Sequence, residues 1–546
     1  MREGYVSMDE MGKTVHVRVA AVKFTALCLA VAQHFTAPIV SQLGAQLMCI
    51  VPRLILITTA TVLVAFGSQE ASAQEHLGEQ LPVKEVTLAN GMRFLILPRD
   101  GSPTVSFVAR FGVGSVHERS GTTGTAHLLE HLLFKGTTTI GTRNVNSERD
   151  LFGIMDAVHD TLIRARAGAE TERVEILSNR IKALEDSARI FTEPNEFDRI
   201  LTEAGARGLN ATTSSEATTY FVELPANRTE LWFALEAERM SDPVFRDFYT
   251  ERNVVMEERR LRVETNPVGL LYEAHLNAAF SVHPYGIPVI GYMSDLETLS
   301  RRDVKDYYNR FYGPNNTVVS IVGDINPDQV EGWARSYFSS VPRGEDPPPI
   351  LVEEPQQVGE RRVIVEWDTE PRLRIGWHVP SSLHRDAETI AILSSILCGG
   401  RTSRLHRRMV LEDRIATAVF ATTGPGARYP QLLTLEATPI GPHTTAELEN
   451  IIYEEIDRLA ADGPTDDELE RVRNQVEAGA IRRIDSNLGV AFQLADSESL
   501  TGDWRHTFRS AARLQRVSAE DVRRVAADYL TEQNRTVAVL KRETGL

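Results

Sequence analysis

The sequence predicts an α+β fold of two homologous domains, each a mostly antiparallel sheet with helices packed on one face, plus a helical hairpin inserted in the first. Three observations lead to this expectation: a repeated helix–strand segment, strands that open each half before its long helices, and a charged helical stretch found only in the first half. At 546 residues the chain also exceeds what a single hydrophobic core usually supports.

The repeat defines the two domains. Residues 300–322 (SRRDVKDYYNRFYGPNNTVVSIV) align without a gap with residues 518–540 (SAEDVRRVAADYLTEQNRTVAVL). Each copy has a serine suited to capping a helix, an apolar stripe at helical spacing, and an asparagine turn before a β-rich strand. We therefore predict domains at 80–342 and 361–546, joined by a proline-rich, acidic linker at 343–360.

Strands are expected at the start of each half. Residues 83–97 and 104–111 alternate apolar side chains, and the Asn90-Gly91 pair within the first stretch is a strong hairpin signal. Residues 362–367 and 373–379 are the corresponding stretches of the second half. Because long helices follow the strands in both halves, the α+β class is favoured over alternating β and α units.

The stretch at 148–193 has no counterpart in the second half. Apolar residues recur in it at spacings of three and four, on two stripes with Gly168 between them: Val174, Leu177, Ile181, Leu184, Ala188 and Phe191 on one, and Leu151, Ile154, Val158, Leu162 and Ala165 on the other. Two such stripes predict an antiparallel helical hairpin with a coiled-coil seam. Its role is left open between a surface excursion, a lid and a partner-docking arm.

The N-terminal 73 residues are predicted to be an extension and a signal peptide. Residues 54–66 (LILITTATVLVAF) form an apolar block after Arg53, and the Ala71-Ser72-Ala73 triplet is a cleavage pattern before Gln74. We expect an exported protein, in the periplasm first of all, with secretion or membrane association as alternatives. The chain would contact the membrane only through this signal peptide, which would serve as a membrane anchor if it stayed uncleaved. Met48 is an alternative start to Met1.

Composition excludes several functions. The net charge is −16 and no dense Lys/Arg run occurs, so nucleic acid is not an expected partner. Of Cys28, Cys49 and Cys398, only Cys398 remains after the predicted cleavage, within an apolar run typical of a buried thiol. A thiolate zinc site is therefore excluded, and any metal must be held by histidine and carboxylate.

The segment 124–137 (GTAHLLEHLLFKGT) carries the main candidate site. On a helix, His127 and His131 project from one face and can bind the same Zn²⁺. Glu130 lies between them, placed to accept a proton from the attacking water rather than to bind the metal. Two histidines with a buried glutamate inside leucine-rich flanks are hard to explain as core packing, because burying that carboxyl without a charge partner is costly.

A catalytic zinc normally has three protein ligands and one open position. The best source of the third is 251–262 (ERNVVMEERRLR), where Glu251 and Glu258 share a helix face. Spacing alone also fits an ordinary solvated helix with i,i+4 salt bridges between glutamate and arginine.

The chain resembles the pitrilysin–insulinase peptidases, the inverted zincins, and within them the shorter processing-peptidase-like bacterial subfamily. The resemblance covers residues 80–541. The blocks that carry it, in order, are HLLEH (127–131), FKGT (134–137), GLNATTSSEATTY (208–220), LEAERM (235–240), ERNVVMEE (251–258), HPYG (283–286), PNNTVVSIVGD (314–324) and GGRTSRL (399–405).

The resemblance implies a zinc-dependent endopeptidase that acts on peptides or extended polypeptide segments. It implies that Glu258 is the third zinc ligand, that Glu251 is an acid orienting the ligands, and that the backbone at Asn210 and Ala211 pairs with the substrate strand. The long separation of His131 from Glu258 is explained by the insertion at 148–193. The alternative is a non-catalytic assembly or chaperone-like subunit, a class that typically loses the zinc motif present here.

One departure from the family bears on partners. Family members often carry an Arg and a Tyr seven residues apart in the second half, and Val410 and Thr417 occupy those positions here. Neither side chain can stabilise a developing oxyanion. We therefore expect a homo- or heterodimer in which a homologue supplies the pair. Local misalignment is the alternative, since Arg407, Arg408 and Arg414 lie nearby.

Overall fold

The computed structural model describes residues 81–542. The predicted signal peptide and extension at 1–73 lie outside the described residues. Within the described part of the chain, no helix has both the length and the apolar character needed to cross a bilayer.

The first half is built on a six-stranded sheet in the order β1-β2-β6-β3-β5-β4. All neighbours are antiparallel except β2 and β6. The strands are β1 (Lys84–Thr87), β2 (Arg93–Pro98), β3 (Thr104–Phe111), β4 (Arg207–Thr213), β5 (Thr218–Pro225) and β6 (Thr317–Gly323). The predicted Asn90-Gly91 hairpin joins β1 to β2. Strand β4 lies at the sheet edge, where one side of its backbone pairs with no other strand of residues 81–542.

The second half has a five-stranded sheet in the order β7-β11-β8-β10-β9, antiparallel except for β7 and β11. Its strands are β7 (Arg361–Trp367), β8 (Arg372–Val379), β9 (Ala416–Gly424), β10 (Gln431–Pro439) and β11 (Arg535–Arg542). Along β8, Leu373 and Ile375 point into the core of this half, while Arg372 and Arg374 point to the opposite face.

The two copies of the repeat occupy equivalent places. Helices α11 (Arg301–Phe311) and α18 (Ala519–Tyr529) each start with a serine capping box, closed by Asp303 and Asp521 respectively. The strand that follows each helix, β6 or β11, has one parallel and one antiparallel neighbour. The predicted α+β class, two mostly antiparallel sheets with helices, is thus confirmed.

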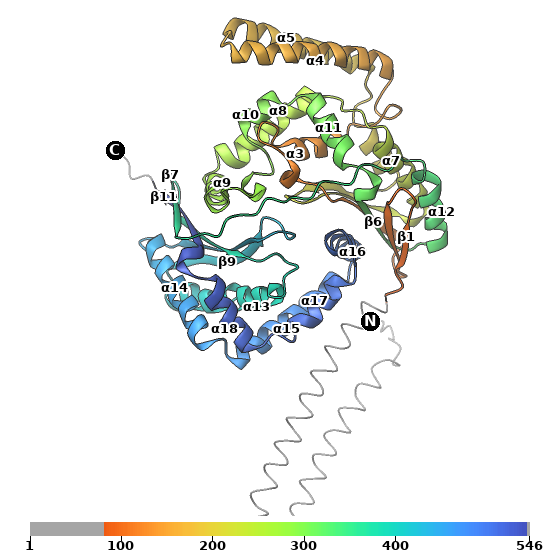
Figure 1. Ribbon diagram of the computed structural model, residues 1–546. Helices are drawn as coiled ribbons and strands as arrows, with labels where there is room; N and C mark the ends of the chain where they lie inside the picture. The colour runs from red at the N-terminus through yellow and green to blue at the C-terminus, as the bar shows by residue number, and fades with distance from the viewer. Residues whose placement is uncertain (1–80, 543–546) are drawn as a thin grey trace, which may run out of the picture. The chain divides into compact units, whose positions relative to one another are not determined.

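Helices cover the sheets (Figure 1). In the first half they are α3 (Thr125–Leu132), α4 (Val145–Ala167), α5 (Thr171–Ala188), α6 (Glu196–Glu203), α7 (Thr229–Ser241), α8 (Phe248–Arg259), α9 (Pro267–Ala279), α10 (Met293–Thr298), α11 and α12 (Pro327–Phe338). In the second half they are α13 (Ala387–Cys398), α14 (Thr445–Asp462), α15 (Asp466–Arg483), α16 (Asn487–Thr501), α17 (His506–Leu514) and α18.

The sequence predicts helices on one face of each sheet, but helices cover both faces of the first sheet. Helix α16 of the second half packs on β3 and β6. Its Val490, Ala491 and Leu494 form one buried cluster with Val108 and Val322 of the first sheet. The first sheet is therefore covered on both faces, because its strands are apolar on both sides.

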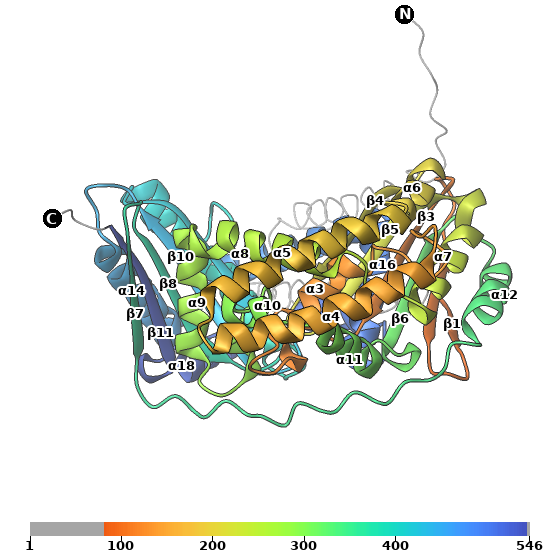
Figure 2. The same cartoon turned by 90° about the horizontal axis from the view of Figure 1, so that it is seen from above.

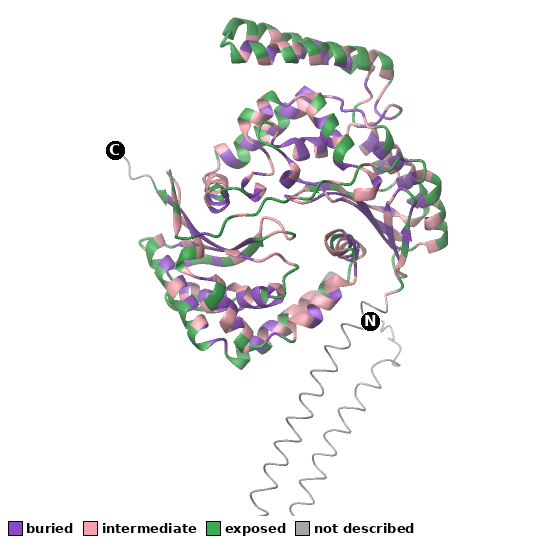
Figure 3. Ribbon diagram, viewed as in Figure 1, coloured by how far each residue is buried: buried purple, intermediate pink, exposed green. Residues whose placement is uncertain are grey.

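Helices α4 and α5 form the predicted antiparallel hairpin (Figure 2). Leu162, Ile181 and Leu184 are buried in it, whereas the side away from the body is exposed (Figure 3). The prediction was wrong for Ile154, which is 47% exposed; Met155, one position later, is buried instead.

The two halves are also joined beside β4. The loop between β4 and β5 carries Glu216, whose carboxylate accepts the N–H of Ala427 (2.9 Å) and of Arg428 (2.8 Å) and the hydroxyl of Tyr285. The predicted linker at 343–360 contains no helix or strand. It is held in place by Glu354, which accepts three successive backbone N–H groups after α9.

Candidate active site

The histidine-bearing helix α3 starts from a constrained turn. Gly124 has φ of +86°, and a Cβ there would lie 2.7 Å from the carbonyl oxygen of Ile290, so glycine is required. The Glu118 carboxylate accepts the N–H of Gly124 (2.9 Å) and of Ala126 (2.7 Å) at the helix N-terminus. Burial raises the pKa of Glu118 to about 8, against the opposing effect of these two hydrogen bonds.

The two faces of α3 have different surroundings. Ala126, Leu128, Leu129 and Leu132 are buried in the core of the first half. His127, Glu130 and His131 lie on the other face and line a cleft of about 1060 Å³. Packing of the leucines therefore fixes the direction in which the polar side chains point.

Helix α8 brings Glu251 and Glu258 to the same place, and the α4–α5 hairpin supports it from outside. Thr250 donates its backbone N–H to Glu185 (2.8 Å), Tyr249 donates its hydroxyl to Asp156 (3.0 Å), and the Arg252 guanidinium contacts His159 (2.8 Å). The hairpin thus lies against the helix that presents two predicted site residues.

His127, His131 and Glu258 converge, with donor atoms all within 4.8 Å of one another. The Nε2 atoms of His127 and His131 lie 3.8 and 3.7 Å from the same Glu258 oxygen, too far for hydrogen bonds. Tetrahedral zinc, with bonds near ~2.1 Å, keeps its donor atoms about 3.4 Å apart. The donor set and spacing therefore fit Zn²⁺ held by two imidazoles and one carboxylate.

The electrostatics at His127 suit a metal ligand. Burial lowers its pKa to about 3, with smaller contributions from His131 and Arg262, so the imidazole is neutral with a free lone pair. Among the described residues, its buried Nδ1 atom has no hydrogen-bond partner.

Two charged side chains orient the other ligands. Glu251 lies 3.4 Å from Nδ1 of His131 and 2.7 Å from the Lys135 ammonium. A proton on Nδ1 leaves the His131 Nε2 lone pair free for a metal. Burial raises the pKa of Glu251, but the His131 hydrogen bond and Lys135 outweigh it, so the pKa is lowered overall. Arg262 contacts the second Glu258 oxygen at 2.8 Å.

Glu130 points into the cleft without joining the ligand set. Burial raises its pKa, and the hydroxyl of Thr213 on β4, which donates to its Oε2 atom, opposes the rise. A carboxylate with an elevated pKa is a better proton acceptor at neutral pH than an exposed one.

The predicted substrate-binding residues line the same cleft. Asn210 and Ala211 lie on β4, with Thr213 at its end. Because β4 is an edge strand, it can accept a further strand, which supports backbone pairing with an extended peptide.

The positions expected to hold an Arg/Tyr pair lie elsewhere. Val410 is in the π-helical segment His406–Glu412 and Thr417 is on β9, and neither lines the cleft. The nearby Arg407, Arg408 and Arg414 do not line it either. The second half instead contributes Arg372, Arg374, Phe420, Pro425 and Glu436.

Sequence reasoning missed four supporting residues: Glu118, Lys135, Thr213 and Arg262. Lys135 follows His131 by four positions and Arg262 follows Glu258 by four, so a search for paired charges near each ligand would have found both. Glu118 and Thr213 form hydrogen bonds with residues of other elements, so no pattern in the sequence around them identifies their roles.

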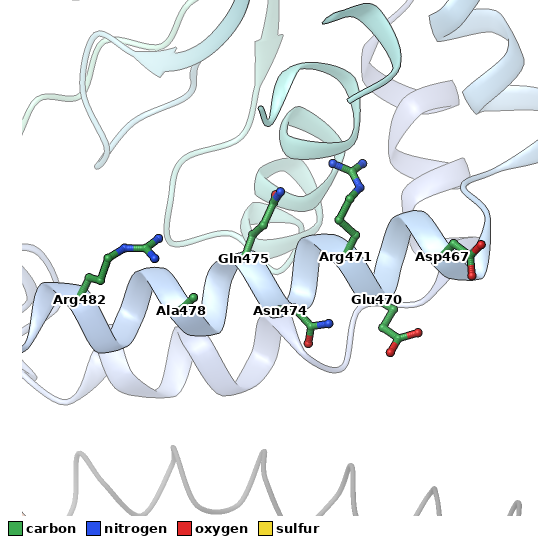
Figure 4. A pocket seen from close by; sticks show the side chains of 7 residues that line it. All are labelled: Asp467, Glu470, Arg471, Asn474, Gln475, Ala478 and Arg482. Atoms are coloured by element: carbon green, nitrogen blue, oxygen red, sulfur yellow. The ribbon is translucent and has the colours of Figure 1, made fainter. Parts of the chain in front are cut away.

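A second, shallower groove follows α15 and contains none of the predicted site residues (Figure 4). Acidic, basic and amide side chains line it, and Arg471 donates to the Thr402 hydroxyl at 3.0 Å.

Two family models match the chain. "Insulinase (Peptidase family M16)" matches residues 95–156 and 187–292, and "Peptidase M16 inactive domain" matches residues 298–476. The interruption of the first match at 157–186 falls within the helical hairpin.

Related proteins agree in length and fold. The zinc protease PqqE of Helicobacter pylori is 27% identical, over 88% of this chain and 97% of its own. The uncharacterised zinc protease YmxG of Bacillus subtilis is 24% identical, over 82% and 96%. The crystal structure of a protease from Helicobacter pylori has a TM-score of 0.71 at 26% identity, covering 84% of this chain and 99% of that one.

Proposed function

Since the chain belongs to the insulinase family of peptidases, M16, we propose that it is a zinc-dependent endopeptidase that hydrolyses peptides or extended polypeptide segments. The observation that carries the proposal is the convergence of His127, His131 and Glu258 beside Glu130, in a cleft bordered by an open sheet edge. The curated relatives named above are called zinc proteases, which supports the metal and the reaction.

The roles of the residues follow from their positions. His127, His131 and Glu258 would hold Zn²⁺, which when bound supplies a Lewis acid for the scissile carbonyl and lowers the pKa of a water molecule. Glu130 accepts the proton of the attacking water and returns it to the leaving nitrogen. Glu251 holds His131 in the tautomer that binds metal, and β4 aligns the peptide backbone at Asn210 and Ala211.

We further propose that the chain works as one of a pair, in which a homologue supplies the missing Arg/Tyr pair; a second copy of this chain would not supply it, because it has the same Val410 and Thr417. The positions of Val410 and Thr417 away from the cleft favour this.

The test is hydrolysis of a mixed set of quenched-fluorescent peptides by zinc-loaded protein. We expect cleavage that a chelator abolishes and added Zn²⁺ restores. Full-rate cleavage by the isolated chain would overturn the partner requirement. Zinc binding with no cleavage, alone or with a homologue from the same source, would overturn the peptidase and favour the assembly-subunit alternative.

We propose that the protein is exported, to the periplasm, on the basis of the apolar block at 54–66 and the Ala71-Ser72-Ala73 triplet. N-terminal sequencing of protein recovered from the periplasmic fraction should begin at Gln74. A product that begins at Met1 or Met48 and stays in the cytosol would contradict export.

A further inference from the structure

Charges in the cleft are almost fully paired. Three of its lining carboxylates have arginine partners: Glu258 with Arg262 at 2.8 Å, Glu273 with Arg259 at 3.0 Å, and Glu436 with Arg374. Glu130, the fourth, is the proposed base. Neither Arg262 nor Arg374 is therefore free to bind an incoming anion.

Arg372 is the exception. It lines the cleft from β8, two residues before Arg374 and on the same face of the sheet. Within residues 81–542 its guanidinium has no hydrogen bond or ion pair, and it is only partly buried.

Packing of the neighbouring strands fixes the position of the Arg372 backbone. Leu373, the next residue, is completely buried in the core of the second half, and β8 is hydrogen-bonded to β10 on one side and β11 on the other. Gly376 lies so close to His275 of α9 that a Cβ would be 2.7 Å from the ring. This close approach packs the face that bears Arg372 against the first half.

We propose that Arg372 is a specificity-determining residue that binds a carboxylate of the peptide substrate, either an acidic side chain or a free C-terminus. The inference rests on the proposed function and deepens it by naming a substrate class. A planar guanidinium forms two parallel hydrogen bonds with a carboxylate. It should therefore bind a carboxylate much more tightly than an uncharged group of the same shape, such as an amide. Phe420, 41% exposed and paired with Glu436 across β9 and β10, offers an apolar surface nearby.

The test uses peptide pairs that differ only by Glu or Gln at one position around the scissile bond, each made with a free and an amidated C-terminus. For the zinc-loaded full chain, kcat/KM should be about tenfold higher for the peptide that bears the recognised carboxylate, either Glu over Gln or a free over an amidated C-terminus. The series in which the preference appears, side chain or terminus, identifies the source of the carboxylate.

Variants assign the preference to Arg372. Arg372→Gln should bring the ratio to about one, and Arg372→Glu should reverse the preference toward a Lys-containing peptide. Arg401→Gln is the matched control, since Arg401 is exposed and outside the cleft. Equal rates in the wild type both between Glu and Gln peptides and between free and amidated peptides, or a preference that survives in Arg372→Gln, would overturn the proposal.

The proposal can be judged even if the isolated chain cleaves none of the peptides, an outcome that the partner requirement also predicts. The same labelled pairs are then titrated against the zinc-loaded chain by fluorescence anisotropy. Tighter binding of the acidic member, lost in Arg372→Gln but kept in Arg401→Gln, supports it. Equal binding, or none, overturns it.

Discussion

Replacing Glu130 with Gln is expected to lower kcat for peptide hydrolysis by about a thousandfold, within the ~10²–10⁴ range of general base catalysis, while zinc stays bound. The amide keeps the shape of the side chain and can still accept from Thr213, but it cannot take a proton from water. Because Glu130 lies outside the converging ligand set, its loss leaves the metal donors intact.

Zinc content by atomic absorption and kcat on a quenched peptide would be measured on the same preparation. Thr213→Val is the matched control, since it removes the neighbour of Glu130 but keeps the carboxylate, and it should cost far less activity. A Glu130→Gln enzyme with zinc bound and more than about a tenth of the wild-type rate would exclude Glu130 as the base.

Replacing His131 with Ala is expected to weaken zinc binding by well over a hundredfold and to abolish hydrolysis. His131 is one of the three side chains that converge as candidate metal donors among the described residues. Losing residues that merely orient a ligand already costs about ten- to a hundredfold in affinity, so losing the ligand itself should cost more.

Glu251→Gln is the matched control for this variant. It retains all three donors but weakens the hydrogen bond to His131, so zinc affinity should fall by about ten- to a hundredfold. Competition with a chelator of known affinity gives both constants. If His131→Ala binds zinc as tightly as Glu251→Gln, His131 is not a ligand.

Local patterns accounted for much of the fold. The aligned segments at 300–322 and 518–540 predicted a helix and a strand that the structure has in both halves. Helical spacing alone was enough to place His127 and His131 on one face. Glu258 could be chosen only through the family resemblance, because spacing did not distinguish it from a solvated glutamate.

What the sequence could not predict depends on contacts between distant segments. Nothing near Glu118 marks it as a partner for the start of α3, and nothing near Arg372 reveals that it faces the cleft of the other half. The error at Ile154 has a similar cause. Helix α4 packs on the body as well as on α5, so its buried side is shifted from an ideal two-helix seam toward Met155.

The packing of α16 on the first sheet has a consequence for folding during synthesis. Every residue proposed to hold or assist the metal is translated before residue 263. The apolar face that contains Val108 and Val322, in contrast, is covered largely by α16 together with Trp504 and Phe508. A nascent chain therefore exposes this face to water until nearly all of it has been made. The first half contains the whole proposed ligand set, but its sheet gains the packing on its second face only when the C-terminal helices dock.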